Sequence, residues 1–231
     1  HFAEIRNRVI LCLSLFLVSF AISYYYSMQI YQFLLKPLVD IYADQEGKRL
    51  IFTGLTEAFV SYLRLSFYAA LFINLPFIFI QFYLFIAPAL YQKERGALLP
   101  VFICSPILFF LGAYLVYEHI FPLAWKFFIS FEQSSNVGLP IVLEARVSEY
   151  LKLSMQLIIA FGMAFQLPVL IYVLVKSGIV SAKALRRQRR LIIVLIISVA
   201  AIITPPDIIS QIGLAIPIYL LFELSILLAR R

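Results

Sequence analysis

The chain has 231 residues, of which 63% are hydrophobic and only 13% are charged, and its formal net charge is +7. A soluble domain is typically about half apolar and about a quarter charged, so a water-exposed fold of this chain would leave large apolar patches uncovered. The composition excludes an ordinary soluble enzyme, a disordered tail and a soluble nucleic-acid binder. It predicts a protein that lies in a lipid bilayer.

Long apolar runs follow one another along the chain, separated by polar connectors. A membrane-spanning helix needs about 20 apolar residues. We therefore predict an all-α integral membrane protein, a single polytopic domain over residues 1–231. Its six transmembrane helices are expected at about 10–35, 58–86, 97–117, 150–175, 191–203 and 208–228. Lys36 and Pro37 are expected to end the first helix, and a longer, wetter segment is expected from Glu118 to Glu149.

The fifth and sixth predicted helices are short. The fifth would rise about 20 Å, whereas the hydrocarbon core of a bilayer is about 30 Å thick. The sequence Thr204-Pro205-Pro206-Asp207 separates the two helices. This pair is expected either to thin the bilayer locally or to reach only part-way across it.

The positive charges predict the orientation in the membrane. When both termini are placed on one side, twelve of the 19 lysines and arginines fall on that side and seven on the other. Because lysine and arginine favour the cytoplasmic side, we predict that both termini are cytoplasmic. The net charge is thus mainly a topology signal, and no nucleic-acid partner is expected.

Polar residues inside membrane helices are costly, so each is a functional candidate. Glu223 lies about two turns before Arg230. Its carboxylate is expected to reach the cytoplasmic interface or to pair with a neighbouring helix. Gln166 lies in mid-helix beside Pro168, where its amide either bonds backbone groups freed by the proline or faces another chain.

Two acidic residues stand out on the predicted cytoplasmic face, which is otherwise strongly basic. Glu4 immediately precedes the first span, and Glu94 lies in the connector between the second and third. One interpretation is local neutralisation, of Glu4 by Arg6 and of Glu94 by Arg95. The alternative is a carboxylate pair on a concave surface that binds an external cation. Arginine would suit such a site, because its guanidinium docks on a carboxylate through two parallel hydrogen bonds.

The sequence carries no pattern of a catalytic centre or a metal site, so we predict neither enzymatic activity nor a cofactor. Cys12 and Cys104 both lie in apolar runs, which favours neither a disulfide nor a cysteine metal site. Asp207 follows two prolines and is expected to cap the next helix.

Four motifs resemble those of the TatC family, the multi-spanning core subunits of the twin-arginine protein translocase. HFAEIR at residues 1–6 is similar to the family's N-terminal signature, and FIAPALYQKER at 85–95 to its first cytoplasmic loop. TPPDIISQ at 204–211 resembles its last extracytoplasmic turn, and FQLP at 165–168 its fourth-helix motif. The motifs occur in the family's order and extend over nearly the whole chain.

The resemblance implies a subunit that exports folded proteins using the proton-motive force. It implies that Glu94 contacts the two arginines of a signal peptide, that Glu4 belongs to the same patch, and that Arg6, Phe85 and Arg95 shape it. Gln166 departs from the family pattern, since many members carry Glu there. A hydrogen-bonding role survives this change, whereas a proton-relay role does not.

The implied partners are twin-arginine signal peptides of folded cargo, the single-span subunits TatA and TatB near the fifth and sixth helices, further copies of the chain, and bilayer lipids. The implied location is the cytoplasmic membrane of a prokaryote, rather than a thylakoid membrane. A secondary transporter remains the alternative function. It would explain Glu223 and the paired Asn74-Leu75-Pro76 and Gln166-Leu167-Pro168 motifs, which are typical of broken helices in transporters.

Overall fold

The computed structural model describes residues 2–42, 50–86, 98–130, 144, 146–176, 178–203 and 208–229. These residues are almost entirely helical. The elements are α1 (Phe2–Tyr25), α2 (Ser27–Tyr42), α3 (Glu57–Ile86), α4 (Leu98–Leu115), the π-helical turn η3 (Val116–Ile120), α5 (Phe121–Ile129), α6 (Val147–Ala164), α7 (Leu167–Lys176), α8 (Ala182–Arg187), α9 (Arg189–Ile203) and α10 (Ile208–Ala229). The predicted all-α membrane class is confirmed.

Four helical stretches in the described part of the chain are long and apolar enough to cross a bilayer. They are Glu4–Tyr25, Glu57–Phe85, Ile103–Ile129 and Val147–Val175. Helix α9 has 15 residues and rises about 22 Å, which is less than the thickness of the hydrocarbon core, about 30 Å. Helix α10 has 22 residues and rises about 33 Å, so the expectation of two short helices holds for α9 alone.

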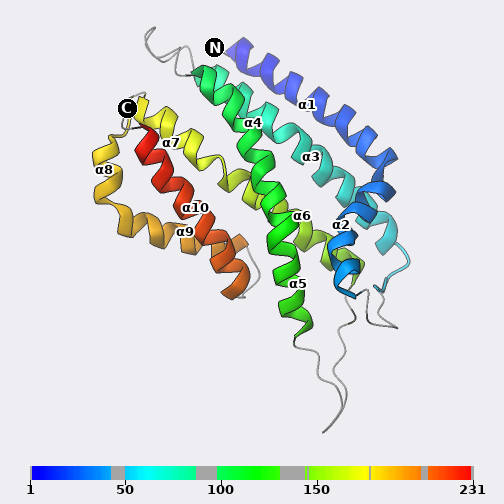
Figure 1. Ribbon diagram of the computed structural model, residues 1–231. Coiled ribbons are helices and arrows are strands. Elements are labelled where there is room, and N and C mark those ends of the chain that lie inside the picture. The colour runs from blue at the N-terminus through cyan, green and yellow to red at the C-terminus, as the bar shows by residue number, and fades with distance from the viewer. Residues whose placement is uncertain are drawn as a thin grey trace.

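The first predicted span is divided into two helices. The chain turns at Tyr26, and α2 leaves the direction of α1 (Figure 1). The expected stop at Lys36-Pro37 is wrong, because α2 continues through Pro37 to Tyr42. Proline has no N–H and leaves the carbonyl of Phe33 without its helical donor. The hydroxyl of Tyr117 donates to this carbonyl at 2.8 Å and replaces the missing bond.

The third predicted span continues well beyond residue 117. The turn η3 joins α4 to α5, and the helix ends only at Ile129. Glu118 and His119 are exposed on this turn, so their polarity does not interrupt the helix. Trp125, expected in a wetter segment, is buried, with its ring centroid 5.0 Å from that of Tyr150.

The helices pack in neighbouring pairs: α1 lies along α3, α4 crosses α6, and α10 packs against α7 and α9 (Figure 1). The α4–α6 crossing is close at two glycines. A Cβ on Gly112 would lie 2.8 Å from the carbonyl oxygen of Phe161, and one on Gly162 would lie 2.6 Å from the Phe109 ring. Small residues of this kind let membrane helices approach each other.

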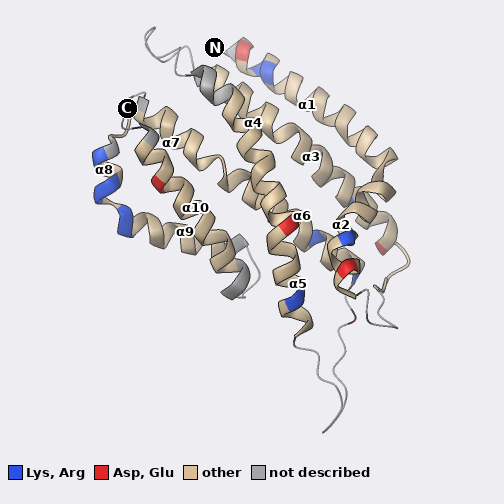
Figure 2. Ribbon diagram, viewed as in Figure 1, with Lys and Arg blue, Asp and Glu red and all other residues tan. Residues whose placement is uncertain are grey.

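Charged residues gather toward the ends of the helices, and the middles of α1, α4 and α7 carry none (Figure 2). Helix α1 begins and α10 ends at the same end of the molecule. At the opposite end, the backbone N–H of Val147 donates to the carbonyl of Ile51 at 3.2 Å, and the Ser148 hydroxyl donates to Glu57 at 2.6 Å. These bonds join the start of α3 to the start of α6.

Candidate functional site

The end of the molecule where α1 begins contains a polar cluster of Glu4, Arg8 and Gln81. Glu4 and Arg8 are one helical turn apart on α1, and the Arg8 guanidinium donates to Glu4 Oε1 at 2.9 Å and 3.3 Å. The same guanidinium donates to Gln81 Oε1 on α3 at 2.8 Å. Arg8 therefore connects the carboxylate of Glu4 to the last turns of α3.

The expected neutralisation of Glu4 by Arg6 is wrong. Residues two apart on a helix do not face each other, whereas residues four apart do. Arg6 is accordingly exposed on another face, and Arg8 is the partner of Glu4. Phe85 is partly buried one turn beyond Gln81, at the end of α3. Glu94 and Arg95 lie outside the described residues.

The carboxylate of Glu4 is only partly used. Both bonds from Arg8 fall on Oε1, and within the described part of the chain no group donates to Oε2. The Glu4 side chain is 41% exposed. A half-exposed carboxylate with one oxygen available can accept a hydrogen bond from an incoming guanidinium. The cluster is therefore suited to bind a cationic group.

Gln166 occupies the break between α6 and α7, and its amide is bonded to α4. Ser105 Oγ donates to Gln166 Oε1 at 2.5 Å, and Gln166 Nε2 donates to the Ser105 carbonyl at 2.9 Å. Both residues are buried. The expected bond to the backbone near Pro168 is thus replaced by a cross-link between helices. Gln166 faces the interior of this chain rather than another chain.

Glu223 pairs with a neighbouring helix, one of its two expected arrangements. Arg189 at the start of α9 donates to its carboxylate at 2.6 Å, and the Tyr219 hydroxyl donates at 3.1 Å. The charge of Glu223 is thus balanced by a cation, which leaves it poorly suited to bind a transported ion. Asp207 lies outside the described residues.

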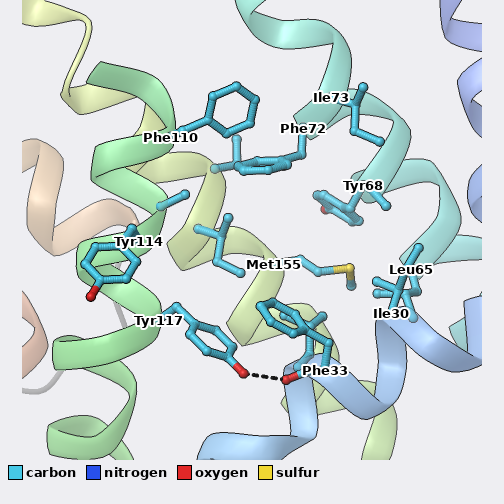
Figure 3. A pocket seen from close by; sticks show the side chains of 15 residues that line it. Ile30, Phe33, Leu65, Tyr68, Phe72, Ile73, Phe110, Tyr114, Tyr117 and Met155 are labelled. Atoms are coloured by element: carbon cyan, nitrogen blue, oxygen red, sulfur yellow. Dashed lines mark hydrogen bonds between the residues drawn. The ribbon is translucent and has the colours of Figure 1, made fainter. Parts of the chain in front are cut away.

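An apolar cavity of about 460 Å³ lies between α2, α3, α4 and α6. Its walls include Tyr68, Phe72 and Met155, and the hydrogen bond from Tyr117 to Phe33 crosses its rim (Figure 3). Such a lining suits an acyl chain or other apolar group. Among the described residues, no group of three or more His, Cys, Asp or Glu side chains could hold a metal ion.

The sequence alone does not single out three residues that the structure brings into these contacts: Arg8, Gln81 and Ser105. The spacing of Glu4 and Arg8 would have identified their pairing, since an acid and a base four residues apart attract each other on a helix. Gln81 is an amide near the end of an apolar helix, which marks it as polar but does not identify its partner 73 residues away. Ser105 gives no comparable signal, because serine is common in membrane helices.

Comparisons with known proteins agree over the length of the chain. A family model described as "Sec-independent protein translocase protein (TatC)" matches residues 1–217. The TatC protein of Rickettsia prowazekii is 46% identical over 228 residues, covering 99% of this chain and 90% of the relative. That of Magnetococcus marinus is 45% identical over 230 residues, covering 100% and 82%. A crystal structure described as a twin-arginine translocase receptor, TatC, matches with a TM-score of 0.82 at 33% identity, covering 100% of this chain and 98% of that one.

Proposed function

The chain belongs to the TatC family of Sec-independent protein translocase proteins, and from this premise we propose that it is the signal-peptide receptor and core subunit of a twin-arginine translocase. The observation that carries the proposal is the half-occupied carboxylate of Glu4, held beside the last turns of α3 by Arg8 and Gln81. The loop with Glu94 directly follows α3 in the sequence.

In this proposal Glu94 binds the paired arginines of the signal peptide, and Glu4 accepts a hydrogen bond through its free oxygen. Arg6, Phe85 and Arg95 shape the surface around these acids. The basic residues of α8 and of the start of α9 would repel positive charges elsewhere on a peptide, and this repulsion narrows the choice of partner. Arg8 attracts the same carboxylate through Oε1, so it weakens the attraction of Glu4 for an incoming guanidinium although both can be bound at once.

The proposed assembly places both termini and the loop with Glu94 in the cytoplasm of a prokaryote, with six spans that include α9 and α10. TatA and TatB bind the outer helices near α9 and α10, and further copies of the chain join the complex. Export of folded cargo then uses the proton-motive force, and the chain itself catalyses no reaction. The pairing of Glu223 with Arg189 favours this role over a secondary transporter, which needs a carboxylate free to bind an ion.

Peptide binding to the full chain in detergent tests the receptor role. We expect Glu94→Gln to weaken binding of a twin-arginine peptide by about 2–5 kcal/mol, as for a desolvated charge pair. Glu4→Gln should cost about 1 kcal/mol, close to a fivefold loss, because Glu4 is partly exposed. Arg8→Gln should strengthen binding, since it releases Glu4 from its internal partner.

Two controls make this experiment specific. Glu149→Gln removes one negative charge at the opposite end, where Glu149 makes only a 3.9 Å contact with Arg146, and should leave binding unchanged. A peptide with two lysines should bind more weakly than the arginine peptide, because lysine cannot form two parallel hydrogen bonds. Equal binding of both peptides, or equal loss in Glu149→Gln and Glu94→Gln, would overturn the receptor proposal.

A further inference from the structure

A groove separate from the cluster around Glu4 lies between α3 and α6, near the end of the molecule where these helices start. Two cations line it: Arg64 on α3 and Lys152 on α6. Both side chains are exposed, and among the described residues no carboxylate pairs with either of them. The groove has a volume of about 410 Å³, and Ser61 and Ser148 contribute hydroxyl groups to its wall.

The acids nearest in sequence are already engaged elsewhere. Glu57, at the start of α3, accepts hydrogen bonds from the backbone N–H groups of Thr53 and Gly54 and from the hydroxyls of Thr53 and Ser148. Glu149, next to Ser148 on α6, lies against Arg146. Within the described part of the chain, the groove therefore presents two positive charges without an internal counter-ion.

The depth of these cations matches the headgroup region of a bilayer. Helix α3 has 30 residues and rises about 45 Å. When it is centred on a hydrocarbon core of about 30 Å, about 7 Å extends beyond each side. Arg64 lies seven residues after Glu57, about 10 Å along the helix. Its long side chain can reach back to the level of the lipid phosphates, as arginine and lysine side chains near helix ends commonly do.

The groove shares walls with the apolar cavity. Tyr68 and Met155, both labelled in Figure 3, line both spaces. A cationic surface and an apolar hollow therefore adjoin each other. A free anion would contact only the cationic groove. A phospholipid can contact both the groove and the cavity, with its phosphate on the cations and an acyl chain along the apolar walls.

We propose that Arg64 and Lys152 bind the phosphate of an anionic phospholipid, one of whose acyl chains occupies the adjoining apolar cavity. The lipid belongs to the leaflet at the end of the molecule opposite the termini. Its single net negative charge offsets one of the two positive charges, whereas a zwitterionic headgroup has no net charge to offset either of them.

Lipid titration of the full chain in detergent, followed by native mass spectrometry and by the melting temperature, tests this proposal. Phosphatidylglycerol should bind at least tenfold more tightly than phosphatidylcholine, and it should raise the melting temperature, because a ligand of the folded state stabilises it. The variant with both Arg64→Gln and Lys152→Gln should lose at least tenfold in affinity for phosphatidylglycerol. Each single variant should lose about threefold.

Lys126→Gln is the matched control. It removes an exposed cation from α5, outside the groove, and should bind phosphatidylglycerol like the parent chain. An equal loss in this control, or an unchanged affinity in the double variant, overturns the proposal. If the double variant has a lower melting temperature than Lys126→Gln in the absence of lipid, its folding is impaired. The affinities of the two single variants for phosphatidylglycerol then test the proposal. Inorganic phosphate and glycerol 3-phosphate should not raise the melting temperature, and an increase equal to that with phosphatidylglycerol would identify free phosphate as the ligand instead.

Discussion

Two polar side chains that the sequence places inside membrane helices are paired with residues of other helices. Gln166 and Ser105 satisfy each other across two helices, and Glu223 is balanced by Arg189. An unpaired polar group in such surroundings costs free energy, so each pair holds two elements together as well as satisfying its own groups. The sequence identified Gln166 and Glu223 as unusual, but their partners come from other elements.

A double-mutant cycle measures the Gln166–Ser105 interaction. We expect Gln166→Leu and Ser105→Ala to be non-additive in the free energy of unfolding. The expected coupling is about 0.6–1.7 kcal/mol, from the average to the largest value found for hydrogen bonds between membrane helices. Chemical unfolding in mixed micelles provides the measurement.

The cycle has a matched control in Ser66. Its hydroxyl donates to the carbonyl of Tyr62 in its own helix, and its side chain is buried like that of Ser105. Ser66→Ala and Gln166→Leu should therefore add within about 0.5 kcal/mol. A Ser105 coupling no larger than this control would contradict the cross-link.

At the scale of elements, helix ends were the least predictable feature. Pro37 was expected to stop a helix, yet the hydroxyl of Tyr117 satisfies the carbonyl that the proline leaves free. The third helix continues past Glu118 because this residue points outward from a π-helical turn. Proline and a charged side chain do disfavour the interior of a membrane helix. At Pro37 a distant hydroxyl compensates for this, and at Glu118 the outward orientation of the turn does so.

The close crossing of α4 and α6 leads to a prediction at the same scale. Gly112→Ala would place a methyl group 2.8 Å from the carbonyl oxygen of Phe161, and this backbone atom cannot rotate away. We expect a loss of about 1–3 kcal/mol in the free energy of unfolding, as for other overpacked sites. Chemical unfolding in mixed micelles can test this loss.

Gly213→Ala on α10 is the comparison for this substitution. Its new Cβ would lie 3.1 Å from Cδ1 of Ile120, the tip of a side chain that can move aside. The gain in helix propensity, up to about 1 kcal/mol in each variant, should leave Gly213→Ala at least as stable as the parent. If Gly112→Ala were equally stable, the crossing would be looser than the structure shows.

At the scale of the whole molecule, the charge distribution and the path of the chain agree. The first and last helices have their outer ends on one side (Figure 1), as the predicted even number of crossings requires. The basic residues of α8 and of the start of α9 belong to that same end (Figure 2). A cytoplasmic position of this end is what the lysine and arginine bias predicts.

Labelling with a membrane-impermeant maleimide tests this orientation in a chain whose Cys12 and Cys104 are replaced by alanine. Ser130→Cys, at the end of α5, should react in intact cells, because the proposed orientation puts this position on the far side of the membrane. Gln188→Cys, between α8 and α9, should react only after permeabilisation. Both positions are exposed, so access to water does not distinguish them. Equal reaction of both sites in intact cells would refute two cytoplasmic termini.

The membrane class, the approximate positions of the apolar runs and the family resemblance followed from the amino-acid sequence alone. Composition, the length of apolar runs and motifs can all be read directly from the sequence. The thickness of the bilayer also restricts spanning helices to a narrow range of lengths. The tertiary structure decided where α1 turns into α2, how far α5 extends, and which partners Glu4, Gln166 and Glu223 take. These outcomes depend on groups that are distant in the chain, because a backbone carbonyl or a polar side chain in an apolar interior is stabilised by whichever partner the packed helices place beside it.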